Sequence, residues 1–344
     1  MSVLEKIRKL KIRRKTYFFI NITLLILLAT VFLNDYIKPS VFSYFGFTAL
    51  IFPLLFTIYI FVSSIWFFRK IKYAIFFLAL SLFFIVPFKR TFNFLPKKKE
   101  KLTETFKVIS FNTRYTYDID IKKLENYLVE NKADIVFLQE IYSRQWKDSN
   151  AFFSERNNAV YGFVGISTIY PIVNSKQVPI PFNGYSCMAD IMYKNDTIRL
   201  LNVYLNPMYL TKKLFEFNST SELTDKTVLL KNKLAEGFKI HQKQVEVIKK
   251  YIDESPYPII VSGDFNSVPN SYEYYQMTQN LTDSFEESGE GLGTTFHDYY
   301  YPLKIDYILY DKNFSSENCT IDRTKKYSDH FPISVNLQYN KVKM

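Results

Sequence analysis

Polar residues with the chemistry of metal and phosphate sites stand at the ends of short apolar segments in the last two-thirds of the chain. Side chains at strand ends can converge on one rim of a sheet while the scaffold holds them rigid. Taken singly, an Asp or Asn at a strand end is usually a turn residue or a helix cap, so the set as a whole carries the prediction. The candidate residues are Asn112, Glu140, Asn202, Tyr204, Asn206, Asp264, Asn266, Asp306, Asp329 and His330.

The chemistry of this set favours a hard divalent cation and a phosphate ester. Carboxylates and carboxamides supply oxygen ligands, which suit Mg²⁺ or Mn²⁺. The chain has three histidines, and none is paired with a cysteine at the spacing of a zinc site. In phosphate chemistry a cation and an imidazole neutralise charge on the phosphoryl group, and an aspartate orients or deprotonates the attacking water.

The elements that must position these residues alternate between strands and helices. Strands are predicted where apolar residues alternate or form short blocks, and helices where they recur every three or four residues. The strands are 106–111, 135–138, 197–205, 258–261, 305–310 and 331–337, and the helices are 121–129 and 240–252. This order predicts an α/β or α+β sandwich. Segment 207–238 fits neither pattern and is expected to be a lid, a recognition loop or a surface excursion.

The first 101 residues have a different composition. Three apolar runs at about 17–33, 41–68 and 71–88 have the length of membrane-spanning helices, which need about 17–25 residues. A signal peptide would contain one such run and a cleavage site. Residues 1–101 are therefore predicted to be a multi-pass membrane anchor with a basic linker, and residues 102–344 a catalytic domain. The alternative is a buried helical hairpin of a soluble protein.

Basic residues are concentrated in this N-terminal part. Residues 1–101 carry a net charge of +14 and the remainder carries −3. The overall +11 is therefore not the mark of a nucleic-acid-binding surface. With three spans, ten Lys and Arg lie on the side of the N-terminus and seven on the side of the catalytic domain. Because cytoplasmic segments carry the excess of positive charge, the catalytic domain is predicted to lie outside the cytoplasm, on a multi-pass protein of the cell membrane.

Six short motifs together resemble the endonuclease/exonuclease/phosphatase superfamily, which includes DNase I-like nucleases, abasic-site endonucleases, neutral sphingomyelinases and inositol polyphosphate 5-phosphatases. The resemblance covers roughly residues 104–339. It implies a four-layer sandwich, in which two mixed β-sheets lie face to face with helices outside, here preceded by three transmembrane helices. The motifs are SFN (110–112), FLQE (137–140), NVYLN (202–206), GDFNSVPNS (263–271), KIDYIL (304–309) and SDHFPI (328–333).

The resemblance also implies a role for each motif residue, beginning with the metal and the water. Glu140 would be the principal ligand of Mg²⁺ or Mn²⁺, with Asn112 beside it and Asp329 on the metal side of the site. Asp264 would position and activate the attacking water. Asn266 would hold the phosphate or that water.

The remaining motif residues would act on the phosphate. His330 would stabilise its developing charge, and Asp306 would pair with the imidazole and keep it cationic. Tyr204 stands where many phosphodiesterases have a histidine. It can donate a hydrogen bond to phosphate but cannot be a second imidazolium. Asn202 and Asn206, in the same motif, would contact substrate.

These inferences predict a membrane-anchored, divalent-metal-dependent phosphoesterase that uses in-line attack of an activated water. The substrate stays open among a lipid headgroup, a nucleotide, a sugar phosphate and nucleic acid, and the lipid bilayer is the other partner. The alternatives are a Mg²⁺-dependent endonuclease acting on DNA and a catalytically inactive scaffold. Outside this set, His241 and His297 are expected to be structural or surface residues. Cys187 and Cys319 are expected to be small buried hydrophobes, with a disulfide as the alternative.

Overall fold

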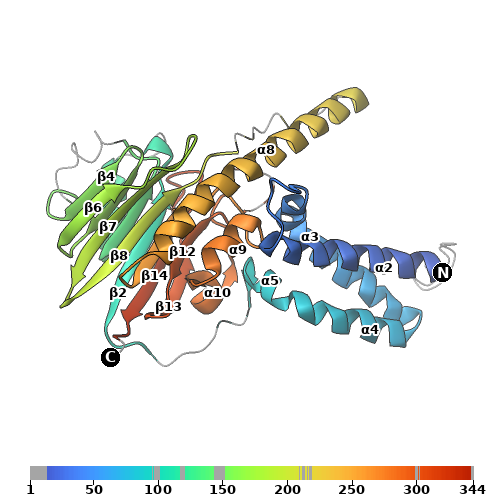
Figure 1. Cartoon of the computed structure of the whole chain (residues 1–344). Coiled ribbons are helices and arrows are strands. Elements are labelled where there is room, and N and C mark those ends of the chain that lie inside the picture. Colours follow the sequence, from blue (N-terminus) through green and yellow to red (C-terminus); the bar gives the residue numbers. More distant parts are fainter. Residues whose placement is uncertain are drawn as a thin grey trace.

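A bundle of apolar helices and a two-sheet domain make up the chain. The computed structural model describes residues 14–94, 96, 101–116, 121–142, 152–208, 210, 214, 216, 219–298, 301 and 303–341. Figure 1 shows helices α2 to α5 projecting from one end of the sheet domain, with the start of α2 far from the sheets. The sheets begin with β2 at Thr105, close to the composition change near residue 101.

Three helical stretches in the N-terminal part are long and apolar enough to cross a membrane. They are Lys15–Asp35, Phe45–Phe68 and Ile71–Lys89, each with a mean hydropathy of 2.2. The second stretch begins at Phe45 rather than at residue 41, because residues 41–44 lie in turns before it. The component helices are α2 (Arg14–Ala29), η1 (Thr30–Asp35), α3 (Phe45–Ser64), η2 (Ile65–Phe68), α4 (Ile71–Ser81), η3 (Leu82–Phe84) and α5 (Ile85–Lys89).

Large aromatic side chains pack the interior of this bundle, and its outer surface is also apolar. Trp66 and Tyr59 are fully buried, and the Tyr59 hydroxyl donates a hydrogen bond to the carbonyl of Phe77 at 2.6 Å. On the outside, Phe61 and Phe83 are among many exposed apolar residues. A helix bundle that is apolar on both faces is typical of a lipid environment.

Two six-stranded mixed sheets form the second part. Their strand orders are β13-β14-β2-β3-β5-β4 and β10-β12-β9-β8-β7-β6. Each sheet has one parallel pair near its centre, β2 with β3 and β8 with β9, and antiparallel strands on both sides. The six predicted strands are confirmed. The strands are β2 (Thr105–Asn112), β3 (Ile135–Gln139), β4 (Asn157–Tyr161), β5 (Val164–Thr168), β6 (Ile172–Gln177), β7 (Tyr185–Tyr193), β8 (Asp196–Tyr204), β9 (Ile259–Asp264), β10 (Thr282–Asp283), β12 (Asp306–Tyr310), β13 (Phe314–Ile321) and β14 (Ile333–Tyr339).

Helices cover the outer faces of both sheets, which completes the predicted four-layer sandwich. α6 (Ile121–Glu130) connects β2 to β3 on one side, and α8 (Thr220–Asp253) connects β8 to β9 on the other, with α9 (Tyr272–Thr278) packed beside α8. A buried cluster fills the space between the sheets. Cys187 and Cys319 are free, buried thiols, as predicted, and are not joined by a disulfide.

Segment 207–238 differs most from the sequence-based expectation. From Thr220 onward it is helix, so α8 begins 20 residues before the predicted helix 240–252. Ser219 caps this helix by accepting a hydrogen bond from the amide of Glu222. Farther along, the Phe238 ring lies edge-to-face against Phe47 of α3, with ring centroids 5.7 Å apart. A contact with the apolar helices α2 to α5 (the membrane-type bundle) therefore supports this part of α8.

The bundle docks on the sheet domain through hydrogen-bonded polar side chains. The Asn270 side chain accepts a hydrogen bond from Arg90 Nη1 at 2.7 Å and donates one to the carbonyl of Pro87 at 3.0 Å. The Asn270 carbonyl accepts a third from Asn34 Nδ2 at 3.1 Å. A single turn of the sheet domain therefore binds both the end of the first stretch and the end of the third.

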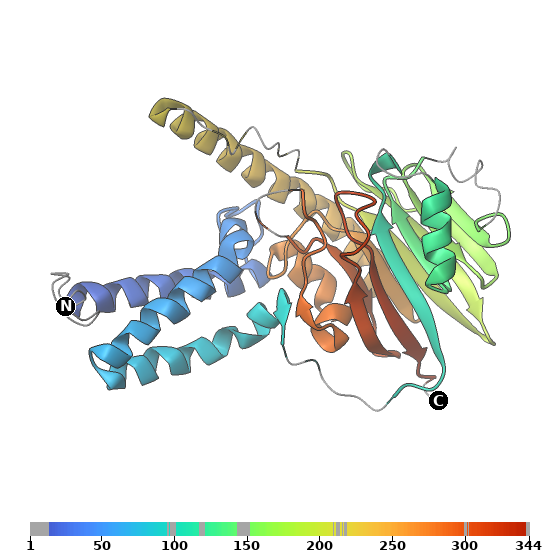
Figure 2. The ribbon, with the colours of Figure 1, turned by 180° about the vertical axis from the view of Figure 1, so that it is seen from behind.

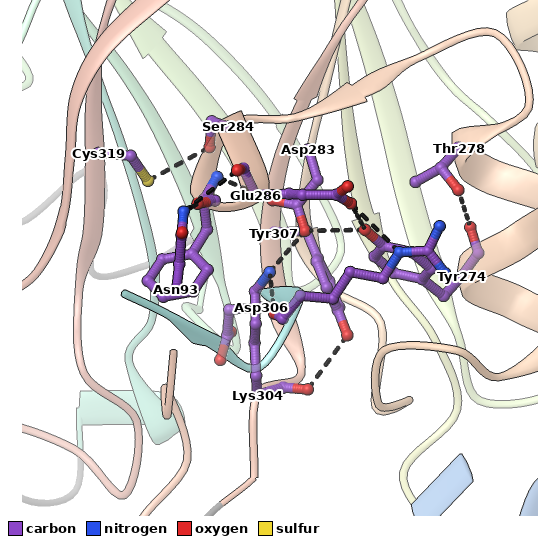
Figure 3. Close-up of polar contacts among 12 residues, drawn as sticks. Asn93, Tyr274, Thr278, Asp283, Ser284, Glu286, Lys304, Asp306, Tyr307 and Cys319 are labelled. Atoms are coloured by element: carbon purple, nitrogen blue, oxygen red, sulfur yellow. Dashed lines mark hydrogen bonds and ion pairs between the residues drawn. The ribbon is translucent and has the colours of Figure 1, made fainter. Parts of the chain in front are cut away.

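A buried ion pair lies next to this contact between the bundle and the sheet domain. Figure 3 shows Lys304 beside Asp283, with Tyr274 and Glu286 nearby. Lys304 Nζ also donates to the carbonyl of Arg90 at 3.2 Å. The small strand pair β1 (Phe92–Asn93) and β11 (Gly291–Leu292) and the short helix α10 (Ser284–Ser288) lie at the same contact.

Candidate active site

The carboxyl ends of the two parallel strand pairs meet at one edge of the sandwich. In the first sheet β2 ends at Asn112, and Glu140 directly follows β3. In the second sheet Tyr204 ends β8 and is the register partner of Asp264, which ends β9. Hydrogen bonds join the two sheets here, from Asn112 Nδ2 to Asp264 Oδ2 at 2.9 Å and from the Tyr204 hydroxyl to Glu140 Oε1 at 2.9 Å.

Two antiparallel strands bring the remaining residues to the same edge. β12 begins with Asp306, whose register partner on β9 is Asp264. β14 runs antiparallel to β2, so the residues just before it arrive where β2 ends. Asp329 and His330 are those residues. The sequence-predicted residues Asn112, Glu140, Tyr204, Asp264, Asn266, Asp306, Asp329 and His330 therefore lie together.

Two side chains donate hydrogen bonds to one oxygen of Glu140. Asn112 Nδ2 donates to Oε1 at 3.1 Å, and the Tyr204 hydroxyl donates to the same oxygen. Burial, followed by the charge of Glu140, raises the pKa of Tyr204, so the phenol stays protonated and acts as a donor. Both contacts orient the carboxylate toward the neighbouring cavity.

Asp264 is buried and accepts three hydrogen bonds. The Asn266 amide donates to Oδ1 at 2.7 Å, and the side chains of Asn112 and Asn266 donate to Oδ2. Burial, followed by the charge of Asp306, raises the pKa of Asp264 to about 8, although the His330 charge and these hydrogen bonds oppose the rise. A carboxylate with this pKa is a stronger base than an ordinary aspartate and, once ionised, can take a proton from water.

His330 forms a buried pair with Asp306. Its Nδ1 lies 2.8 Å from Asp306 Oδ2, and its Nε2 lies 3.8 Å from Asp264 Oδ2. Burial disfavours the cationic imidazole, but the charges of Asp306 and Asp264 outweigh burial and raise the pKa of His330 to about 10. Because an ionised carboxylate only accepts, Nδ1 donates to Asp306, and Nε2 carries the second proton toward the cavity.

Several supporting residues were not among the predicted site residues. Thr295 Oγ1 accepts the backbone N–H of Asp306 at 3.1 Å, and the Phe296 ring lies edge-to-face against His330. Arg114 Nε lies 3.5 Å from Asp329 Oδ2. His297 stacks on Phe331 and donates to the carbonyl of Ser328, so it supports the loop that carries His330. None of these contacts has a local sequence signal, because each joins segments that are distant in the chain.

Asn202 and Asn206 lie apart from this group. Asn202 is buried between the sheets, where Nδ2 donates to the carbonyls of Leu138 and Gly165 and Oδ1 accepts from Gln139. Asn206 Nδ2 donates to the carbonyl of Pro207. The Asn206 carbonyl accepts from His241 Nε2 at 2.6 Å. His241, predicted to be a structural or surface residue, is fully buried.

A cavity of about 220 Å³ opens at the converging strand ends. Glu140, Asp264, Asp329 and His330 form its polar wall, and apolar side chains complete it. The other lining residues are Leu50, Pro207, Met208, Leu210, Leu234, Phe238, Asn266, Ser267, Val268, Phe296, Leu303 and Ile305. Among these described residues His330 is the only basic group, so the polar wall has an excess of negative charge.

Sequence comparison adds an independent finding to this geometry. The profile of the Endonuclease/Exonuclease/phosphatase family matches residues 109–330, which is well over half of the chain. The chain belongs to this family. A profile described as a domain of unknown function matches residues 14–91. No curated protein matches the chain significantly.

Solved structures share the fold of the Endonuclease/Exonuclease/phosphatase domain. A humanized D. rerio TDP2 is 16% identical, with a TM-score of 0.52 over 68% of this chain and 99% of that chain. D. rerio TDP2 complexed with single-strand DNA product is 15% identical, with a TM-score of 0.53 over 69% and 100%. A functionally unknown conserved protein from Enterococcus faecalis is 14% identical, with a TM-score of 0.50 over 68% and 100%. At these identities the likeness shows the fold.

The donor set of the cavity fits the divalent cation that this family implies. Three carboxylates line the cavity, and oxygen ligands of this kind suit Mg²⁺ or Mn²⁺. Asp264, Asp306 and His330 also bring ligand atoms within 4.8 Å of one another. However, His330 Nδ1 is already bound to Asp306. Asp306 and His330 therefore form a pair that holds a proton, and Asp264 is the carboxylate beside this pair.

Proposed function

We propose that this protein is a membrane-anchored, divalent-metal-dependent phosphoesterase in which an activated water attacks phosphorus in line with the leaving oxygen. The observation that carries the proposal is the arrangement of Glu140, Asp264 and the Asp306–His330 pair around one cavity. It combines a cation ligand, a carboxylate with a pKa of about 8 and a cationic imidazole. A catalytically inactive scaffold would not need a buried set of titratable residues that shift one another's pKa values.

Glu140 would hold Mg²⁺ or Mn²⁺, with Asp329, which lines the same cavity, as a further ligand. The cation would supply positive charge to a phosphoryl oxygen. Asn112 acts as a positioning residue, because its amide donates to both Glu140 and Asp264 and fixes the distance between them. Tyr204 holds the same Glu140 oxygen from the other sheet.

Asp264 orients the attacking water and accepts its proton at a carboxylate oxygen. Asn266 anchors Asp264, because its side chain bridges that carboxylate and the carbonyl of Leu205. His330 directs Nε2–H toward the cavity and stabilises negative charge on the phosphoryl group. Asp306 keeps the imidazole cationic and correctly oriented through the bond at Nδ1.

The membrane placement is part of the proposal. Residues 1–101 would form the anchor with its linker and 102–344 the catalytic domain. The three helical stretches put the sheet domain at the opposite end of the bundle from Lys70 and Lys72, at the start of α4. With the excess of Lys and Arg on the N-terminal side, the catalytic domain would face away from the cytoplasm.

A DNA endonuclease is the second candidate, favoured by the likeness in fold to TDP2 complexed with single-strand DNA product. Proteins that bind nucleic acid neutralise phosphates with Lys and Arg. No Lys or Arg is among the described residues that line the cavity, and much of its wall is apolar. A small or amphiphilic phosphate ester therefore fits the cavity better than a nucleic-acid strand does.

Hydrolysis of bis(p-nitrophenyl) phosphate by the purified full-length protein tests the proposal. We expect release of nitrophenol with Mg²⁺ or Mn²⁺, its abolition by a chelator, and a loss of about 10²–10⁴-fold in the Asp264→Asn variant. Abasic DNA, intact DNA and single-stranded DNA form a parallel arm. Equal rates for the wild type and Asp264→Asn would overturn the proposed chemistry, and preferred cleavage of DNA would favour the second candidate.

A further inference from the structure

A second cavity continues from the active site toward the membrane-type bundle. It has a volume of about 530 Å³ and lies between α3 and the first half of α8. Leu50, Leu210, Leu234 and Leu303 line both this cavity and the active-site cavity, so the two adjoin. Its other lining residues are Tyr44, Phe47, Ile51, Leu54, Thr227, Leu230, Lys231 and Tyr301. We call this second cavity the apolar groove.

α3 links the apolar groove to the outer surface of the bundle. One side of α3 is buried against the other apolar helices through Phe52 and Tyr59. The groove side carries Leu54, and the next exposed apolar residues at helical spacing are Ile58 and Phe61. This stripe would face lipid in a membrane, so the groove opens along α3 into the hydrocarbon layer.

α8 forms the opposite wall. The first half of this helix projects beyond the sheets, as Figures 1 and 2 show from opposite sides. Leu230 and Leu234 face the groove one turn apart. Lys231 Nζ lies over the ring of Tyr44, 4.8 Å from its centroid, and this pair marks the polar edge of an otherwise apolar wall.

A soluble sugar phosphate or nucleotide has no group that would occupy such a groove. An amphiphile with a phosphate ester at one end and a long alkyl or prenyl chain at the other matches both cavities. Its headgroup would reach the carboxylates, and its chain would extend past the shared leucines toward the bilayer. The volume lies within the range of about 300–1,000 Å³ typical of small-molecule sites.

We propose that the apolar groove binds the hydrocarbon chain of a lipid phosphate ester whose headgroup is hydrolysed at the active site. The inference rests on the proposed phosphoesterase activity and adds its substrate class. The anchor then has a second role beyond tethering, because α3 supplies one wall of the substrate site. A catalytic domain separated from its anchor would lack that wall.

Binding of alkyl phosphates to the full-length protein in detergent-free amphipol tests the inference. Calorimetry with Mg²⁺ present compares ethyl, hexyl, octyl and dodecyl phosphate below their micelle concentrations. Each methylene that leaves water for an apolar site strengthens binding, so the additional methylenes of dodecyl phosphate should make it bind at least about 100-fold more tightly than ethyl phosphate. Affinity that does not depend on chain length would overturn the groove assignment.

Two neighbouring leucines of α8 provide a matched pair of variants. Leu230 lines the groove, and Leu229, turned by about 100°, does not line it and is 46% exposed. Leu230→Asn should weaken dodecyl phosphate binding by about 10-fold, the loss of roughly one apolar contact. Leu229→Asn should leave it unchanged. Equal effects of the two variants would mean that the chain binds elsewhere.

The proposed phosphoesterase activity and the proposed binding of a hydrocarbon chain in the apolar groove can be overturned separately. Binding that depends on chain length, without any hydrolysis of bis(p-nitrophenyl) phosphate, would overturn the proposed phosphoesterase activity but not the assignment of the groove. Hydrolysis together with binding that does not depend on chain length would overturn the assignment of the groove but not the phosphoesterase activity. If a second copy of the chain covers the groove instead, the particle mass measured by light scattering doubles and Leu230→Asn restores the monomer.

Discussion

Glu140 and Asn266 have a left-handed backbone conformation, with φ of 51° and 45°. For a residue other than glycine this conformation costs roughly 1–2 kcal/mol. Hydrogen bonds compensate at both positions: Thr113 Oγ1 donates to the Glu140 carbonyl at 2.8 Å, and the Asn266 amide is bound to Asp264. The strain lies at the residues that aim carboxylates into the cavity, which is where the chemistry requires a fixed geometry.

Glu140→Gln separates cation binding from folding. Glutamine can still accept the hydrogen bonds from Asn112 and Tyr204 through its carbonyl oxygen, so the fold should be retained. The amide lacks the negative charge that attracts a cation. We expect the Mg²⁺ concentration for half-maximal activity to rise at least about 10–100-fold. Metal titration of activity measures this, and an unchanged metal requirement would remove Glu140 from the cation site.

The pH profile should be bell-shaped, because activity needs ionised Asp264 and protonated His330. Activity is lost on the acid side as pH falls through the Asp264 pKa, about 8 without a cation, and a cation at Glu140 should move this limb to lower pH. It is lost on the alkaline side as pH rises through the His330 pKa of about 10. A profile of kcat/KM at several metal concentrations checks both limbs.

Asp306→Asn should move both limbs of this profile to lower pH, because the charge of Asp306 raises the pKa of Asp264 as well as that of His330. Asparagine can still accept from His330 Nδ1 but removes this charge, so the alkaline limb should move down by about 1–3 pH units. A lower rate with an unmoved alkaline limb would show that Asp306 acts only by positioning the ring.

At the scale of the elements, the site depends on the close contact of β8 with β9. Gly263 has φ of 141°, and a Cβ built there would lie 1.9 Å from the carbonyl oxygen of Val203. Gly263→Ala should therefore destabilise the protein by about 3 kcal/mol or more. Gly291, with φ of 80° and open space around it, is the control. Gly291→Ala should cost only the conformational strain, about 1–2 kcal/mol. Denaturant unfolding compares the two, and equal losses would rule out the steric explanation.

The strands of the catalytic core could be predicted because burial on both faces gives them short apolar blocks. The site residues at the ends of these strands could be predicted because the direction of the chain determines at which edge of the sheet each strand ends. Asn202 shows the limit of this reasoning: it points to the same face of β8 as Leu200 and Tyr204, but lies inside the sandwich rather than at its rim. The first half of α8 was missed because its apolar partner is α3, a segment about 190 residues earlier. No local pattern records such a contact.

At the scale of the whole molecule, Asn270 is one of the polar residues that join the bundle to the sheets. Its φ is 67°, so Asn270→Gly keeps the backbone conformation and removes the two side-chain hydrogen bonds. We expect a loss of about 1–3 kcal/mol, because Arg90 and Pro87 lose partners. Asn318, exposed and with φ of 54°, is the matched control. Thermal unfolding of the full chain should show a lower midpoint for Asn270→Gly alone.

The orientation of the whole molecule can be tested because its own cysteines are buried and free. Lys194, on the sheet domain, has a side chain that is 58% exposed, and Lys72, in the first turn of α4, is exposed at the other end of the bundle. With three spans, these residues lie on opposite sides of the membrane. We expect a membrane-impermeant maleimide to label Lys194→Cys in intact cells and Lys72→Cys only after lysis, because the Lys and Arg excess retains the N-terminal side in the cytoplasm. The reverse labelling pattern would place the catalytic domain inside the cell, and labelling of both in intact cells would mean that the three stretches do not all span.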